Sequence, residues 1–227
     1  MLEAALAIGL NQLTMAAVAE RLGVGKAVLY GYVANRAELV RLATAHTLRK
    51  HRFPGDDGQP WSLWVLEYAR ALFEVLTMEG DLLEAWMGGS QSTLVEVDSA
   101  EAWLRALTKR GFTGEEALQL RRSVSQIVIG AAASWKRDGI LHAKGRPRQM
   151  SITKAVLDRP AAETDLLRQF IATFAREMTE TGWEYTLYLL LRGVLADRDA
   201  LAVSAEDAAL PFADLALGAF IDRTVEN

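Results

Sequence analysis

The chain has 227 residues, of which 51% are hydrophobic, and it contains three histidines and no cysteine. This composition predicts one or two globular domains and excludes disulfides, thiolate metal sites and a cysteine nucleophile, while the scarcity of histidine argues against a histidine-rich metal centre. No apolar run approaches the ~20 residues that a membrane span needs, and the first residues do not resemble a signal peptide, so we expect a cytoplasmic protein.

Charge is distributed unevenly along the chain. The net charge of −4 by itself argues against nucleic-acid binding, but residues 1–52 carry seven basic and three acidic side chains. This stretch therefore has a charge of +4 and the remainder has −8. A basic head on an acidic body is typical of a nucleic-acid-binding protein, although a chance fluctuation over so short a window would look the same.

Apolar residues recur at helical spacing nearly everywhere and strand alternation is absent, which predicts an all-α fold. Thr14 and Asn35 are suited to cap helices, and Gly23 is suited to end one. We expect the first four helices at about residues 2–9, 15–22, 26–33 and 36–52.

The Pro-, Gly- and Asp-rich segment 54–60 is the first clear break, and we place a domain boundary just before it, between residues 1–48 and 49–227. The stretch 139–160 is basic, contains Pro147 and is predicted to be a mobile loop. We expect further helices at 61–78, 82–87, 93–110, 115–137, 162–181 and 183–197, and a helical tail at 204–223.

Residues 14–33 fit a helix-turn-helix, in which two short helices meet at a tight turn. Ala19 allows the helices to approach closely, and Gly23 tolerates the positive backbone angle of the turn. Apolar residues fall where the core between the helices is required, and an ordinary pair of core helices is the alternative interpretation. The expected core residues are Val18, Leu22, Val24 and Leu29.

Residues 13–40 resemble the TetR family of transcriptional regulators. The resemblance is carried by the pairs Leu13-Thr14, Gly23-Val24, Leu29-Tyr30 and Asn35-Arg36 at fixed spacing. Residues 102–135 and 182–197 look more loosely like the regulatory domain of tetracycline-repressor-like members. The resemblance implies an N-terminal three-helix DNA-binding domain followed by a C-terminal helical domain for ligand binding and dimerisation.

The resemblance also implies DNA contacts. Lys26 is the one obvious hydrogen-bonding base reader and would prefer guanine edges, while Tyr30 and Tyr32 would bind phosphates. Core packing explains Tyr32 equally well. Gly25 stands where a capping Ser is frequent, and few reading residues are polar, so specificity is expected to depend on DNA shape. The expected DNA-binding residues are Thr14, Met15, Arg21, Lys26, Ala27, Tyr30, Gly31, Tyr32, Asn35 and Arg36.

The helices at 115–137 and 183–197 are apolar around much of their circumference, so each must be buried on two sides. A four-helix bundle across a two-fold axis satisfies this requirement and would place two heads on half-sites about 34 Å apart; burial within one chain is the alternative. The expected interface residues are Leu120, Val124, Ile127, Val128, Ala131, Leu187, Leu191 and Val194.

Aromatic residues are concentrated after residue 60, and together they could line a pocket for an apolar or aromatic ligand, although any one of them could simply be core. Tetracycline-binding members hold a magnesium–drug complex with a body histidine, and no histidine lies between Phe53 and Leu141, so we expect neither that chemistry nor a cofactor. The expected pocket residues are Trp64, Tyr68, Trp86, Trp103, Gln126, Trp135, Phe170 and Phe174.

These features predict a homodimeric repressor that binds an inverted-repeat operator and is released by a small apolar or aromatic ligand acting through the fourth helix. A helical small-molecule-binding protein or enzyme is the alternative, but the sequence offers no phosphate loop, metal-ligand spacing, catalytic triad or dinucleotide fingerprint. A regulator that activates, or that answers to a protein partner, is also open.

Overall fold

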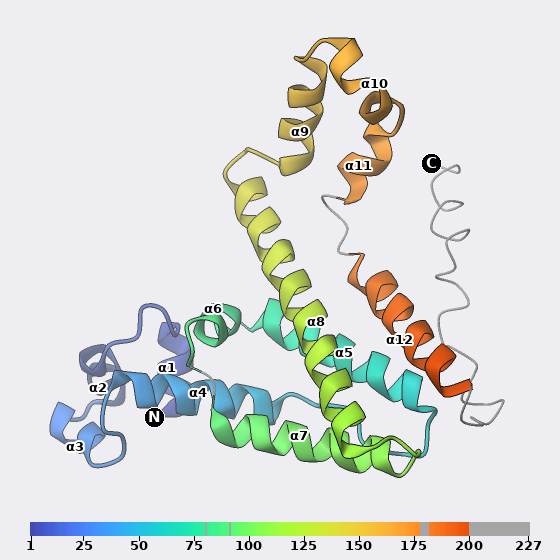
Figure 1. Cartoon of the computed structure of the whole chain (residues 1–227). Helices are drawn as coiled ribbons and strands as arrows, with labels where there is room; N and C mark the ends of the chain where they lie inside the picture. Colours follow the sequence, from blue (N-terminus) through green and yellow to red (C-terminus); the bar gives the residue numbers. More distant parts are fainter. Residues whose placement is uncertain (80, 91, 178–181, 200–227) are drawn as a thin grey trace. The chain divides into compact units, whose positions relative to one another are not determined.

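The computed structural model describes residues 1–79, 81–90, 92–177 and 182–199, and all of the regular elements in these ranges are helices (Figure 1). The predicted all-α class is therefore confirmed. The chain forms two compact units, residues 1–126 and 127–227, so the helix α8 belongs to both. The predicted helical tail at 204–223 lies outside the described residues.

The described residues of unit 1 form eight helices, the last of which belongs to this unit only in part. They are α1 (Leu2–Ile8), α2 (Met15–Leu22), α3 (Lys26–Tyr30), α4 (Arg36–Lys50), α5 (Trp61–Met78), α6 (Leu82–Met87), α7 (Thr93–Thr108) and α8 (Gly114–Ala143). The predicted helices agree closely, except that α3 stops three residues before the expected Val33 and α8 continues six residues past the expected Arg137.

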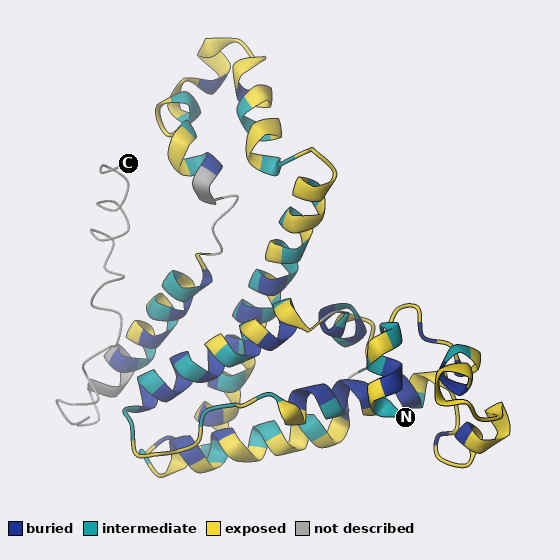
Figure 2. Cartoon of the chain, turned by 180° about the vertical axis from the view of Figure 1, so that it is seen from behind, coloured by how far each residue is buried: buried dark blue, intermediate teal, exposed yellow. Residues whose placement is uncertain are grey.

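The first four helices share a small core at the N-terminal end of unit 1 (Figure 2). Leu13, Leu29 and Leu39 are almost completely buried in it. Ala85 of α6 belongs to the same cluster, so this head is packed against the rest of unit 1 rather than tethered to it. The compact unit extends well beyond residue 48, where the sequence predicts a boundary between two domains. That boundary stays a prediction.

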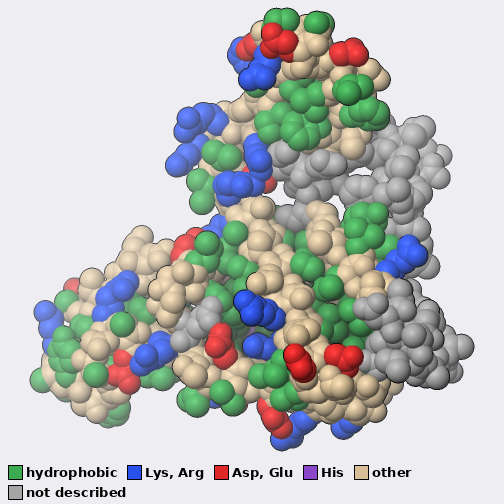
Figure 3. All heavy atoms as spheres, viewed as in Figure 1, with side chains coloured by type: hydrophobic (Ala, Val, Ile, Leu, Met, Phe, Trp, Pro, Cys, Tyr) green, Lys and Arg blue, Asp and Glu red, His purple; other side chains and the backbone are tan. Residues whose placement is uncertain are grey.

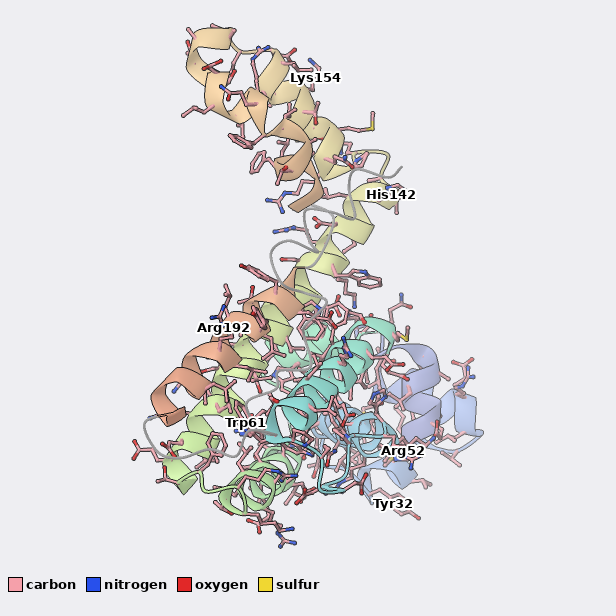
Figure 4. All side chains as sticks on the ribbon, turned by 90° about the vertical axis from the view of Figure 1, so that its right-hand side faces the viewer. Tyr32, Arg52, Trp61, His142, Lys154 and Arg192 are labelled. Atoms are coloured by element: carbon pink, nitrogen blue, oxygen red, sulfur yellow. The ribbon has the colours of Figure 1, made fainter. Side chains whose placement is uncertain are left out.

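A second, aromatic-rich core lies behind the head in unit 1. Trp61 and Trp64 of α5 and Trp103 of α7 are almost fully buried, and Trp61 lies among the helices of this unit (Figure 4). The Trp64 and Trp103 rings meet edge to face, with centroids 5.0 Å apart, which is a favoured geometry for aromatic pairs. Phe112 packs on Trp61 in the same way at 5.2 Å.

Unit 2 contains the end of α8 and the helices α9 (Arg148–Leu157), α10 (Ala161–Gln169), α11 (Ile171–Glu177) and α12 (Trp183–Asp199). Helix α9 packs against α10 and α11. The Arg168 side chain of α10 closes this arrangement by donating hydrogen bonds to the backbone oxygens of Val156, Leu157 and Arg159 at the end of α9.

Two sequence predictions fail in unit 2. The segment 139–160 is mostly helical instead of a loop, because α8 runs to Ala143 and Pro147 stands just before α9, where a proline is compatible with a helix start. The helix predicted at 162–181 breaks at Phe170, whose backbone angles are non-helical, and its last residues lie outside the described range.

Figure 3 shows Lys and Arg side chains gathered near the connection between α8 and α9.

Candidate nucleic-acid interface and ligand cavity

The turn between α2 and α3 has the geometry that the sequence predicts. The Thr14 Oγ1 atom accepts a hydrogen bond from the Ala17 N–H at 3.1 Å and caps α2. Gly23 ends α2 in the left-handed conformation, with φ of 67°, a conformation that costs glycine little. Its N–H and that of Val24 donate to backbone oxygens of the last turn of α2. The two short helices are therefore held at a fixed angle by local interactions.

Helix α3 has one buried anchor and an exposed outer surface. Leu29 is 2% exposed and fixes the helix to the head, whereas Tyr30 is 54% exposed. Lys26, the predicted base reader, is also exposed, as are Ala27 and Gly31, which the sequence predicts to bind DNA. Gly25 stands at the N-cap of α3 and provides no side-chain cap, as expected where a glycine replaces the capping Ser frequent in the family. A helix that is packed against the protein on one side and exposed to solvent on the other is suited to enter a DNA groove.

Tyr32 follows α3 and projects away from the head (Figure 4). Its side chain is 75% exposed, so the alternative that it packs in the core is wrong. The sequence predicts that Leu22 and Val24 lie in the core, but they are 39% and 38% exposed. They stand on either side of Gly23, in the turn between α2 and α3. Val18 and Leu29 alone of the four expected core residues are buried.

The other residues predicted to contact DNA differ in how exposed their side chains are and in the hydrogen bonds that they make. Arg21 and Asn35 are exposed, and the Asn35 side chain caps α4 by accepting from the Glu38 N–H at 2.9 Å. The Met15 side chain is buried, so only the backbone of this residue is open to a phosphate. Together with Thr14, the start of α2 thus offers backbone N–H groups rather than side chains.

Arg36 has a structural role that the sequence analysis missed. Its Nε donates to the Leu13 oxygen at 2.6 Å, and its Nη2 donates to the Leu10 and Asn11 oxygens at 2.9 and 3.3 Å. These bonds tie the loop before α2 to the first turn of α4. The DNA contact predicted for Arg36 stays a prediction and would depend on its remaining nitrogen, Nη1.

Helix α4 is also fastened to α1. The Glu3 carboxylate accepts from His46 Nε2 at 2.8 Å and from the Lys50 ammonium. The hydrogen bond from Lys50, and then that from His46, lower the pKa of Glu3 to about 2. Both partners lie in the second half of α4, so the head holds this helix along much of its length.

A cavity of about 250 Å³ lies inside unit 1, next to the end of α4. Its walls come from the helices α4 to α8 and from the segment that follows α4. Most of the surface is apolar or aromatic, as is usual for small-molecule sites. The lining residues are Leu48, Arg49, His51, Phe53, Tyr68, Leu72, Trp86, Val95, Glu96, Asp98, Ser99, Ala102, Arg121 and Ser125.

Two of the eight predicted pocket residues, Tyr68 and Trp86, line this cavity. Trp64 and Trp103 lie in the core behind it and pack on the Tyr68 ring at 5.5 and 5.2 Å. Gln126 is exposed and does not belong to the lining. The other three lie in unit 2, where Trp135 and Phe170 are exposed and Phe174 is half-buried.

The sequence contained signals for some of the missed lining residues. Val95, Ser99 and Ala102 recur at helical spacing on one face of α7, and Arg121 and Ser125 lie one turn apart on α8. His51 also lines the cavity, and it stands just before the histidine-free range between Phe53 and Leu141. In the part of the chain that the structure describes, no three His, Asp or Glu side chains are grouped to hold a metal ion.

Polar groups meet at one place in the cavity wall. The Tyr68 hydroxyl and Ser99 Oγ are 2.8 Å apart and share a hydrogen bond, and Arg121 Nη1 donates to Ser99 Oγ at 3.4 Å. Burial raises the pKa of the Tyr68 phenol, with the hydrogen bond to Ser99 acting in the opposite direction. At the rim, Arg49 Nη2 and Asp98 Oδ2 form an ion pair at 3.0 Å that joins α4 to α7.

The predicted dimer residues differ in burial. Leu120, Val124, Val128, Leu187 and Leu191 are buried within the single chain, whereas Ile127, Ala131 and Val194 are half-buried. Leu118 of α8 and Leu189 of α12 are large apolar side chains that are 40% and 49% exposed. The two helices thus bury part of their apolar surface within the chain and leave part exposed.

Among the described helices, none is long and apolar enough to cross a membrane.

Family models and known proteins match nearly all of the chain. Residues 3–43 match the model of bacterial regulatory proteins of the tetR family, and residues 53–198 match the tetracyclin repressor-like C-terminal domain. The tetracycline repressor protein class D of Escherichia coli is 25% identical over 213 residues, which cover 90% of each chain. The class E repressor of Escherichia coli is 31% identical over 125 residues, 54% of this chain and 59% of its own.

Solved structures agree in fold. The Streptomyces coelicolor TetR family protein ActR in complex with actinorhodin superposes with a TM-score of 0.74 at 22% identity, over 86% of this chain and 93% of that one. Mycobacterium smegmatis BioQ superposes with a TM-score of 0.54 at 25% identity, over 78% and 94%. The chain therefore belongs to the tetR family of bacterial regulatory proteins and is a DNA-binding transcriptional repressor with a ligand-binding C-terminal domain, not an enzyme.

Proposed function

We propose that this repressor binds an inverted-repeat operator as a homodimer through α3 and leaves it when a small aromatic molecule enters the cavity of unit 1. The observation that supports the proposal most directly is the course of α4. This helix begins at Arg36, after a short connection from the end of α3 at Tyr30, and its last turn contributes Leu48 and Arg49 to the cavity wall.

The DNA-binding part of the proposal is supported by exposure and chemistry. Lys26 stands at the first position of α3, exposed, where a lysine can donate to guanine O6 and N7. Tyr30 at the end of α3 and Tyr32 just after it are exposed, and their hydroxyls can bind backbone phosphates. Ala27 and Gly31 keep the surface flat, so close approach of the backbone and local DNA shape contribute to specificity.

The homodimer is supported by the apolar residues that α8 and α12 leave uncovered. Leu118 and Leu189 belong to the two helices that the sequence assigns to a two-fold interface. A second copy would cover such side chains and set the spacing of two heads near one turn of DNA, about 34 Å.

A protein that binds an operator acts where the chromosome is, so the proposed location of this repressor is the cytoplasm.

The ligand is proposed from the character of the cavity. The rings of Phe53, Tyr68 and Trp86 line it, and aromatic walls favour a flat aromatic guest. The relatives point the same way, since ActR is solved with actinorhodin and the class D relative is named a tetracycline repressor. His51 is the histidine in this lining, and its neighbour Phe53 packs on its ring at 5.6 Å.

Release follows if the ligand binds one position of α4 better than another. A ligand shifts an equilibrium only by its difference in affinity for the two states. Leu48, Arg49 and His51 lie at the cavity while the other end of α4 is bonded to the head, so contacts made in the cavity bear on the placement of α3.

Selection of bound DNA from a random pool tests the proposal. We expect an inverted repeat whose half-site centres lie one helical turn apart, with affinity that falls steeply as salt rises. Selection of a single, unrepeated site, or no enrichment above random DNA, would overturn the homodimeric operator. Titration of the selected duplex with planar aromatic compounds then tests release, and unchanged DNA affinity at saturation of the cavity would contradict the ligand response.

A further inference from the structure

We propose that Arg121 makes this cavity a receptor for aromatic acids: the ligand carries an ionised carboxylate or phenolate that Arg121 holds, with Tyr68 and Ser99 beside it. This inference rests on the proposed function, because it concerns the ligand of the same cavity. It adds the charge of that ligand, which neither the family models nor the relatives assign.

The Arg121 side chain is incompletely satisfied in the ligand-free chain. Its Nη1 makes a hydrogen bond of 3.4 Å to Ser99, close to the outer limit for such bonds. Its Nε is buried and has no hydrogen-bond partner among the described residues. No described carboxylate pairs with this guanidinium, and a partly buried cation without a counter-charge is unfavourable unless something else neutralises it.

The polar groups of the cavity are grouped around Arg121. Ser99 Oγ lies between the guanidinium and the Tyr68 hydroxyl, at 3.4 and 2.8 Å, so three helices bring these groups together. Ser125 lines the wall one turn further along α8. A single polar corner in an aromatic cavity orients a ligand that has one polar end and one flat apolar end.

The two acidic lining residues do not cancel this charge. Asp98 is already paired with Arg49, and both side chains are more than half exposed, which places the pair at the rim. Glu96 is exposed as well. Solvent screens exposed carboxylates, whereas the interaction of an anion with Arg121 is screened less because part of that side chain is buried. The part of the cavity wall at Arg121 therefore favours an anion.

The experiment compares two probes that differ in charge and little in shape, anthraquinone-2-carboxylate and anthraquinone-2-carboxamide. Binding to the full chain is measured by equilibrium dialysis and by quenching of tryptophan fluorescence, since Trp86 lines the cavity. A charge-assisted hydrogen bond in a partly buried site is expected to favour the acid roughly tenfold to hundredfold.

Three variants assign that preference to Arg121. In Arg121→Gln the preference for the acid is lost while the amide binds as before, and in Arg121→Lys most of it remains because the charge is kept. Arg122→Gln removes an exposed arginine next along the same helix and leaves both affinities unchanged. Circular dichroism and operator binding of each variant show that it is folded.

The outcomes separate this inference from the proposed function. Equal affinity for the two probes in the unaltered chain, or a preference that survives in Arg121→Gln, overturns the role of Arg121, and so does failure of both probes to bind. If both probes bind equally and release the operator, the proposed function stands and the inference fails. If the acid is preferred through Arg121 but the operator is not released, the inference stands and the proposed ligand response fails.

Discussion

The DNA-facing head and the cavity lie in the same compact unit, but they are built in different ways. The head is fixed by hydrogen bonds between side chains and backbone. The caps at Thr14 and Asn35 are local, whereas Arg36 bonds to the loop before α2, and the outer surface of α3 is exposed. The cavity is enclosed by side chains from distant parts of the sequence, and its one polar corner is loosely bonded. Under the proposed function, the comparison is between a preformed DNA-reading surface and a cavity whose polar groups a ligand would complete.

The largest expected effect removes the anchor of the reading surface. Leu29→Ala deletes a buried side chain at the centre of the head, and we expect the free energy of unfolding to fall by about 2–5 kcal/mol. Urea denaturation measures the loss. Val28→Ala, at a neighbouring position that is 50% exposed, serves as the control. A similar loss in both variants would show that α3 is not anchored through Leu29.

The next effect concerns the reading surface itself. Lys26→Ala removes the exposed lysine at the start of α3, and we expect operator affinity to fall by about 1–3 kcal/mol without a change in stability. Fluorescence anisotropy with the selected duplex measures the affinity. Lys154→Ala, an exposed lysine of α9 in unit 2, should leave it unchanged. Undiminished affinity of Lys26→Ala would exclude this lysine from the interface.

A smaller effect tests the local bonds that hold the head. Thr14→Ala removes the cap of α2 and should lower the free energy of unfolding by about 1 kcal/mol, whereas Thr14→Ser keeps the hydroxyl and most of the stability. Thermal denaturation distinguishes the two. If serine and alanine were equally destabilising, the methyl group rather than the hydroxyl would be the stabilising part of Thr14.

The smallest effect is the dependence of stability on pH through Glu3. Lys50 and His46 lower the pKa of this carboxyl from 4.5 to about 2, so Glu3 stabilises the folded chain above pH 4.5 and loses that contribution as the pH falls toward 2. The melting temperature of Glu3→Gln should therefore lie slightly below that of the unaltered chain at neutral pH. The two should converge in acid, and the difference should shrink in high salt because the pair is exposed.

The fold and the head could be predicted because their determinants are local. The positions of Thr14, Gly23 and Asn35 set where helices begin and end, and the structure confirms each of these roles. For Arg36 the sequence predicts only a DNA contact, because it does not show that the oxygens of residues 10–13 turn toward this side chain. Predicting these bonds needed the position of a loop more than 20 residues away.

The cavity could be predicted only in part because it depends on how five helices pack. Aromatic character identified Tyr68 and Trp86 but could not separate them from Trp64 and Trp103, which have the same chemistry and lie in the core. Arg121 and Ser99 were missed because each looks like an ordinary polar residue of an exposed helix face. Their approach to each other follows from the crossing of α7 and α8.

The bonds of Arg36 bear on how this repressor could be recombined with others. Because its guanidinium holds the loop at residues 10–13 against the start of α4, the N-terminal segment and that first turn are matched parts. Glu3 extends the match to Lys50. A chimera that grafts a foreign sensor onto this head should therefore be joined after Lys50, since a junction within α4 would separate Lys50 from its partner Glu3.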